Sequence, residues 1–144
     1  MKPGDWAEIG GAAFSVARPL DFRYQPQGDW QRFVADGHTF VALRAQPETR
    51  PSPEALAALV RDAGAGVEGF VGERPFLFPL AEHVWDRVNF AYTAADGTEI
   101  WGVIMTRVSA GQEIVAWAEA PASAYNELEA TVFLTVIADM RVGE

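Results

Sequence analysis

Apolar and polar residues alternate along three runs in the C-terminal part of the chain, and a turn follows each of the first two runs. The runs span Trp85–Thr93, Glu99–Val108 and Gln112–Ala120. Alternation with a period of two is typical of a half-buried β-strand. Asp96-Gly97 and Ser109-Ala110-Gly111 place a glycine where a tight turn requires positive φ. The pattern therefore predicts an antiparallel meander of three strands.

After the third run, apolar residues recur at spacings of three and four, which predicts an amphipathic helix from Ser123 to Arg141. Three strands with one apolar face need a covering layer, and we expect this helix to supply it. The apolar face of the predicted helix consists of Tyr125, Leu128, Val132, Phe133, Val136, Ile137 and Met140.

The N-terminal third of the chain predicts further short strands, joined in part by a hairpin. Apolar-rich runs cover Ala12–Ala17, Trp30–Ala35 and Thr39–Gln46. Asp36-Gly37 separates the last two runs, and this dipeptide is a strong hairpin signal.

A helix is predicted between this hairpin and the meander. Ser52 is expected to cap it, Pro53 suits its first turn, and Gly64 and Gly66 end it. Its apolar stripe consists of Leu56, Leu59 and Val60.

Two less regular segments follow this helix. Val67–Val71 is expected to form a short strand. Gly72–Leu80 contains Pro75 and Pro79, which favours an edge strand or a packed loop over a central strand.

This order of elements resembles the fold shared by the photosystem II extrinsic protein PsbP, the nuclear-transport factor Mog1 and the bacterial DcrB-like proteins. The resemblance covers nearly the whole chain in layout. It implies a single α+β domain over residues 1–144, with a mostly antiparallel twisted sheet flanked by a short internal helix and a long C-terminal amphipathic helix. The features that carry it are the Phe14–Val16 opening, the Asp36-Gly37 hairpin, the helix at Pro53, the Asp96-Gly97 meander and Val132-Phe133-Leu134 in the closing helix.

Composition narrows the classes of function. The 144 residues carry a net charge of −9, which disfavours nucleic acid as a partner because such binding depends on cationic side chains. The absence of cysteine excludes disulfides, thiolate metal sites and a cysteine nucleophile. No apolar run is long enough to span a bilayer. Residues 1–11 do not form a signal peptide, so we expect a cytoplasmic protein, or an exported one if a leader has been removed.

No catalytic, metal-binding or cofactor-binding arrangement emerges from the sequence. His38 follows a turn, and His83 is adjacent to Glu82, with which it would point to the opposite face of a strand. No spacing of histidines and carboxylates resembles a metal site, and no serine lies in a nucleophile elbow. We therefore expect a protein without enzymatic activity.

The lengths of the two meander turns decide which side chains share a face, because a shift of one residue inverts a strand. If both turns are three-residue loops, Tyr92 lies opposite Ile100 and Thr106 lies opposite Ile114. Ala95-Asp96-Gly97 suits such a loop, with the glycine in the left-handed region. Two-residue turns would instead move Trp101, Val103 and Met105 toward the C-terminal helix.

With three-residue loops, one sheet face is rich in aromatic rings and edged by charge, which suits binding of an apolar surface. The alternative is that the first helix or residues 76–78 cover this face, since large aromatic residues are usually buried. The candidate binding residues are Trp85, Arg87, Trp101, Val103, Met105, Arg107 and Trp117.

A protein partner is the first functional hypothesis, because proteins of similar layout act as accessory subunits, transport cofactors or chaperones. Homo-oligomerisation remains open. The second hypothesis is a small apolar or anionic ligand on the same face, with Arg87 or Arg107 binding an anionic group of the ligand. Cross-strand ion pairs are also expected, between Arg87 and Glu113 or between Arg107 and Glu119.

Overall fold

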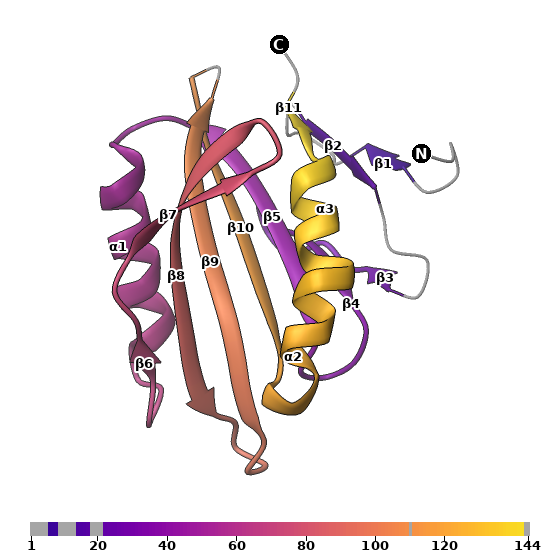
Figure 1. Cartoon of the computed structure of the whole chain (residues 1–144), viewed down its shortest axis with the longest axis vertical. Coiled ribbons are helices and arrows are strands. Elements are labelled where there is room, and N and C mark those ends of the chain that lie inside the picture. Colours follow the sequence, from indigo (N-terminus) through magenta and orange to yellow (C-terminus); the bar gives the residue numbers. More distant parts are fainter. Residues whose placement is uncertain (1–5, 9–13, 18–21, 110, 143–144) are drawn as a thin grey trace.

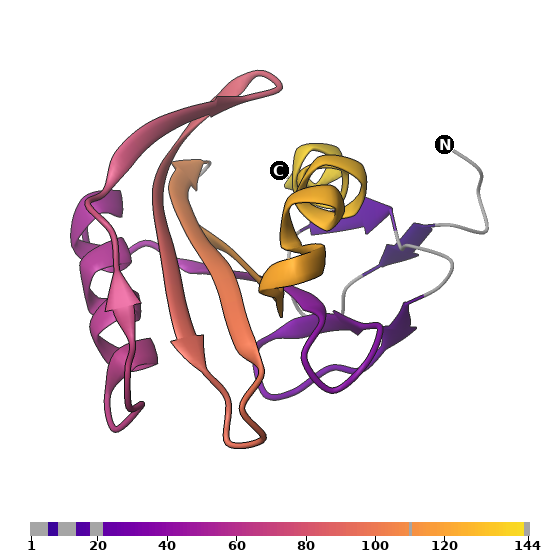
Figure 2. The same cartoon turned by 60° about the horizontal axis from the view of Figure 1, so that its bottom comes forward.

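A long, strongly twisted sheet lies between two helical layers in the computed structural model, which describes residues 6–8, 14–17, 22–109 and 111–142 (Figures 1 and 2). The helices are α1 (Ser52–Gly64), α2 (Ala122–Leu128), the π-helix η2 (Glu129–Phe133) and α3 (Leu134–Asp139). The strands are β1 (Trp6–Glu8), β2 (Phe14–Ala17), β3 (Arg23–Tyr24), β4 (Gln31–Val34), β5 (Phe40–Pro47), β6 (Val71–Gly72), β7 (Phe76–Leu80), β8 (His83–Thr93), β9 (Glu99–Ser109), β10 (Gln112–Pro121) and β11 (Arg141–Val142).

The main sheet has eight strands, in the order β3-β4-β5-β10-β9-β8-β6, with β7 also pairing with β8. A smaller sheet has the order β1-β2-β11, and all of these pairs are antiparallel. Helix α1 covers one face of the main sheet and the C-terminal helical segment covers the other (Figure 2). The predicted α+β class, with an antiparallel sheet between helices, is confirmed.

The predicted short strand Val67–Val71 is largely wrong. Gly66 and Gly69 both have positive φ, at 72° and 75°, so the chain turns here and pairs with β8 only at Val71–Gly72. The following segment, Gly72–Leu80, contains an edge strand, which was one of the two alternatives predicted for it. This strand, β7, exposes 68% of Leu77 and places Pro79 opposite Val84.

The register of the first meander turn is confirmed. Tyr92 pairs with Ile100, and Gly97 has a φ of 88°. The side-chain Oδ1 of Asp96 accepts a hydrogen bond from the Thr98 backbone N–H at 3.0 Å. This bond closes the loop within itself and stabilises the three-residue form.

The predicted register of the second turn is wrong. Ser109 pairs with Gln112, so the loop has two residues, and Thr106 lies opposite Val115 rather than Ile114. Gly111, with a φ of 74°, provides the left-handed residue of this turn. The Ser-Ala-Gly sequence has no aspartate to close a wider loop as Asp96 does in the first turn.

The shorter turn inverts β10 relative to the prediction and changes what each helix covers. The C-terminal helical segment packs on the face that carries Trp85, Trp101, Val103 and Met105, together with Ala116, Ala118 and other small residues of β10. Helix α1 packs on the opposite face through Leu56, Leu59 and Val60, as its apolar stripe predicts. The strand residues in that second core are Val88, Phe90, Tyr92, Ile104, Val115 and Trp117.

The C-terminal helical segment differs from the single helix predicted over Ser123–Arg141. It contains the π-turn η2 and ends at Asp139, after which β11 joins the smaller sheet. The N-terminus of α1 also differs, because the Ser52 hydroxyl bonds to Thr106 Oγ1 at 2.8 Å and makes no capping bond. None of the described helices is long and apolar enough to cross a membrane.

Candidate functional site

A pocket of about 350 Å³ opens between the edge of the main sheet at β6 and the C-terminal helical segment. In Figure 1 this part of β8 and β9 lies between α2–α3 and the strands β6–β7. The volume falls within the range of small-ligand sites and equals the space of a few amino-acid side chains. The lining residues are Val71, Glu73, Arg87, Asn89, Phe90, Ala91, Trp101, Gly102, Tyr125, Asn126 and Glu129.

Strand pairing explains how the floor of the pocket forms. Val71 pairs with Ala91, and Ala91 pairs with Trp101, so these three residues lie side by side on one face. The backbone N–H of Glu73 bonds to the Asn89 carbonyl at 2.8 Å, which fixes Glu73 beside the floor. Ala91 has a small side chain, and this leaves room above the sheet between its neighbours.

A polar network forms the inner end of the pocket. Arg87 is only 5% exposed, and its Nε donates to Asn89 Oδ1 at 2.9 Å. Its terminal nitrogen forms an ion pair with Glu129 Oε1, which also accepts a hydrogen bond from the Tyr125 hydroxyl at 2.9 Å. The buried cation is therefore both charge-compensated and hydrogen-bonded, as burial requires.

Aromatic rings enclose this network on two sides. The Arg87 guanidinium carbon lies 4.4 Å from the centroid of the Phe78 ring and 5.7 Å from that of Phe76. On the helical side, the rings of Trp101 and Tyr125 meet edge to face, with centroids 6.3 Å apart. Both contact types are favourable beyond the area they bury.

The ionisation of Tyr125 is also set by this site. Burial, followed by the Glu129 carboxylate, raises the pKa of the Tyr125 phenol above its usual range. Tyr125 therefore remains a neutral donor to Glu129 at physiological pH. Glu129 is the first residue of the π-helix η2, and single π-turns occur frequently at functional sites.

The predicted binding residues divide into three groups in the structure. Arg87 and Trp101 line the pocket. Val103, Met105 and Trp85, of which Trp85 is 1% exposed, are sealed beneath the C-terminal helical segment and belong to the core. The prediction of an open aromatic face is therefore wrong for these three, because the two-residue turn places them on the same face as Ala116 and Ala118, which the C-terminal helical segment covers.

Arg107 lies on the same face as Trp85 but outside the pocket. Its guanidinium carbon is 4.9 Å from the Trp85 ring centroid, and its Nε has no hydrogen-bond partner within the described part of the chain. Burial lowers the pKa of the Arg107 guanidinium. The expected cross-strand pair with Glu119 does not form, because Glu119 lies on the other face.

Trp117 lies on the face covered by α1 and does not share a face with Trp85 and Trp101 as predicted. Its Nε1 donates to Glu119 Oε2 at 2.8 Å, and Tyr92 donates to Glu119 Oε1. Burial raises the pKa of Glu119, although both hydrogen bonds act in the opposite direction. The pair expected between Arg87 and Glu113 is also absent, since Glu113 pairs with Arg44 and Arg50 at 3.7 and 3.1 Å.

Sequence reasoning missed the helical and edge residues of the pocket. Tyr125 was predicted only as part of the apolar face of the C-terminal helix, and Glu129 lay within that helix but outside its apolar face. The signal that could have indicated them is a polar residue one turn after a large aromatic residue, which places both on one helix face. Pairing with Arg87 depends on how the helix packs, and no local pattern shows this.

The histidines and acidic residues form no metal site in the part of the chain that the structure describes. His38 Nε2 lies 2.7 Å from Asp96 Oδ2, so the hairpin turn of β4–β5 contacts the first meander turn. This pair lies outside the lining of the pocket.

Comparisons with known proteins show similarity in structure only. No family model and no curated protein matches the sequence. Among solved structures, cyanobacterial PsbP (CyanoP) from Synechocystis sp. PCC 6803 is 8% identical, with 95% of this chain and 91% of that chain covered and a TM-score of 0.69. The Ran-binding protein Mog1p of Saccharomyces cerevisiae is 11% identical, with coverages of 95% and 94% and a TM-score of 0.63.

A third similar structure is LpqN of Mycobacterium tuberculosis, a protein involved in cell envelope biogenesis. It is 14% identical, with 95% of this chain and 87% of that chain covered and a TM-score of 0.57. At such identities the likeness shows the fold and not the activity. It covers almost the full length of each chain and confirms the resemblance that the order of elements suggested. The chain has the fold shared by PsbP and Mog1.

Proposed function

We propose that this chain is a non-enzymatic binding protein and that it receives part of a protein partner in the pocket between β6, β8, β9 and the C-terminal helical segment. The observation that carries the proposal is the half-buried Trp101, which lines a preformed pocket beside Tyr125 and a fixed polar network. Aromatic residues flanked by polar groups are typical of the energetic centres of protein interfaces.

Two further observations support a binding role. Arg87, Asn89, Tyr125 and Glu129 are bonded to one another at the inner end of the pocket, so they form a rigid wall rather than a reactive group awaiting a substrate. One protein of similar fold, Mog1p, is described as Ran-binding, which makes a protein partner the leading hypothesis by analogy of fold.

Affinity capture with a pocket-filling variant tests the proposal. The full chain, Ala91→Phe and Ala57→Phe would each be used as bait in a lysate of the native source. Ala91 lines the pocket, whereas Ala57 is exposed on α1 and serves as the matched control. We expect a protein that both the wild type and Ala57→Phe retain to be lost with Ala91→Phe. Equal retention by all three baits would contradict the pocket as the binding site.

A small ligand in the same pocket is the second candidate, favoured by the volume of about 350 Å³. Titration of intrinsic tryptophan fluorescence with a library of apolar and aromatic compounds would detect it. A response abolished by both Trp101→Ala and Ala91→Phe, with no protein captured, would favour this candidate over a protein partner.

A further inference from the structure

We infer that the pocket recognises a positively charged side chain, a lysine or an arginine, supplied by the protein partner. The inference rests on the proposed function and specifies the chemistry of that same pocket. Three features carry it: the charges that line the pocket, the bonds that Arg87 makes to other residues of the chain, and the aromatic rings of Trp101 and Tyr125 in the lining.

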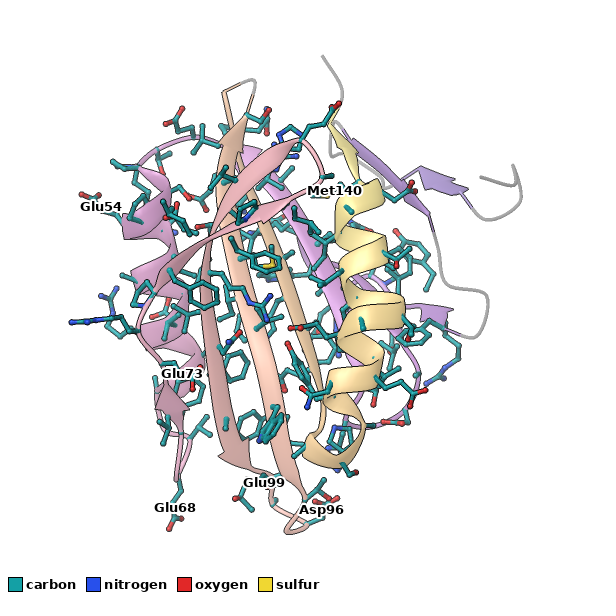
Figure 3. The ribbon with its side chains drawn as sticks, viewed as in Figure 1. Glu54, Glu68, Glu73, Asp96, Glu99 and Met140 are labelled. Atoms are coloured by element: carbon teal, nitrogen blue, oxygen red, sulfur yellow. The ribbon has the colours of Figure 1, made fainter. Side chains whose placement is uncertain are left out.

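The first feature is the balance of charge. Among the lining residues, Glu73 and Glu129 are acidic and Arg87 alone is basic. Glu129 lines the pocket and exposes 23% of its side chain, and the bonds from Arg87 and Tyr125 both go to Oε1, so no described residue binds Oε2. Glu73 is exposed on the opposite side (Figure 3). A ligand thus meets a carboxylate from each side.

The second feature is that Arg87 does not offer an anion site. Its Nε bonds to Asn89, its terminal nitrogen pairs with Glu129, and its flat face lies over Phe78. An anionic ligand would have to displace Glu129 and leave a carboxylate near it without a partner, which is unfavourable in a partly buried site. The geometry therefore does not support the hypothesis that Arg87 binds an anionic group of a ligand.

The third feature is the pair of rings formed by Trp101 and Tyr125. The face of an aromatic ring carries partial negative charge and attracts ammonium and guanidinium groups. Burial, followed by the nearby Glu129 carboxylate, raises the pKa of Tyr125 and keeps it neutral, and its hydrogen bond to Glu129 holds it in place. Carboxylates and aromatic rings around one hollow favour a cation with an apolar stem, which describes lysine and arginine side chains. The net charge of −9 adds long-range attraction for such a partner.

The inference can be tested with the full chain and small probes, because the partner itself is not required. Isotope-labelled protein would be titrated with a blocked tripeptide that has a central lysine, and with counterparts carrying arginine, norleucine or glutamate. We expect the Trp101 indole N–H and Asn126 amide resonances to shift with lysine and arginine. Affinity should exceed that for norleucine by about three- to thirtyfold, from cation–π and ion-pair contributions together. Equal binding of norleucine, stronger binding of glutamate, or no shift with any probe would overturn the inference.

Two charge variants distinguish the effect of a carboxylate in the pocket from the effect of the protein's overall negative charge. Glu73 and Glu68 are both exposed carboxylates near β6, but only Glu73 lines the pocket (Figure 3). Glu73→Gln is expected to weaken lysine-peptide binding by about 1.5- to fivefold, as for an exposed ion pair, and Glu68→Gln to change it less. Equal effects of the two variants would overturn the inference.

Failure of this inference is distinguishable from failure of the proposed function. If Ala91→Phe loses the captured partner while lysine and arginine peptides bind no more tightly than the norleucine peptide, the pocket binds a protein but does not select for a cation. If Ala91→Phe retains the partner, the pocket is not the binding site, and the proposed function itself fails.

Discussion

Gly102 lies directly beneath the ring of Phe90, its cross-strand partner on the face covered by α1. A Cβ atom at Gly102 would be 2.2 Å from Phe90 Cζ and 2.7 Å from both Cε atoms. The Phe90 ring is held in this position by stacking on Phe70, with centroids 5.2 Å apart. The absence of a side chain at Gly102 therefore allows an aromatic ring to lie flat on the sheet.

Gly102→Ala should destabilise the protein by about 1–3 kcal/mol, the range for overpacking a filled core. Equilibrium urea denaturation would measure the free energy of unfolding. Gly37→Ala is the matched control, because a Cβ there meets nothing within 4 Å. If Gly102→Ala lowers the free energy of unfolding no more than Gly37→Ala does, the prediction is contradicted, and the ring of Phe90 can move aside at little energetic cost.

Removing one partner of the Arg87–Glu129 pair should destabilise the fold more than removing both. Glu129→Leu leaves Arg87 buried with only Asn89 as a hydrogen-bond partner, and we expect a loss of about 1–3 kcal/mol. The double variant Arg87→Met/Glu129→Leu should lose less stability than Glu129→Leu alone. A double-mutant cycle on unfolding free energies measures the coupling, and additive losses would contradict it.

Glu119 should make the protein less stable as the pH rises. Burial raises its pKa in the folded state, so its stabilising contribution is complete below the ordinary carboxyl pKa and is lost as the pH rises through the raised value. Glu119→Gln cannot titrate. The stability of the wild type relative to Glu119→Gln should therefore decrease as the pH increases from about 4. A difference that is constant or grows with pH would be evidence against a buried, proton-binding Glu119.

Asp96 should act in the opposite direction. Hydrogen bonds from the Thr98 backbone and from His38 lower the pKa of Asp96 to about 2, from a usual value of 3.8. Its contribution to stability is therefore present above the usual value and is lost as the pH falls from about 4 to about 2. Thermal unfolding of wild type and Asp96→Asn should differ at neutral pH and converge in acid. The effect is expected to be small because Asp96 is exposed, and a difference that persists unchanged at pH 2 would contradict the prediction.

Local patterns were sufficient to predict most of the fold. Alternation in β8, β9 and β10 and the apolar stripe of α1 are dictated by neighbouring residues, and both are present in the structure. The first meander register was also predictable, since Asp96 closes its own loop through a bond to Thr98. The second register was predicted wrongly, because Ser109-Ala110-Gly111 has a glycine where the first turn has one but lacks the aspartate that closes the wider loop.

The grouping of the candidate residues depended on this one turn, and only two of them line the pocket. Arg87 and Trp101 were identified and do line the pocket, but Trp117 moved to the other face with the inverted strand. Glu129 could not be connected to Arg87 because 42 positions separate them and the packing of the helix alone brings them together. The protein partner, the absence of catalysis, the single-domain organisation and the cytoplasmic location remain predictions.

The proline at position 79 bears on how this protein avoids self-association. Strand β7 lies at a sheet edge, and its apolar residues Leu77 and Phe76 are 68% and 42% exposed, a combination that favours pairing with further chains. Proline has no N–H to donate, and a foreign strand laid along this border would find a gap in the ladder at that point. Pro79 thus disfavours extension of the sheet by further chains, while the apolar side chains of β7 stay exposed.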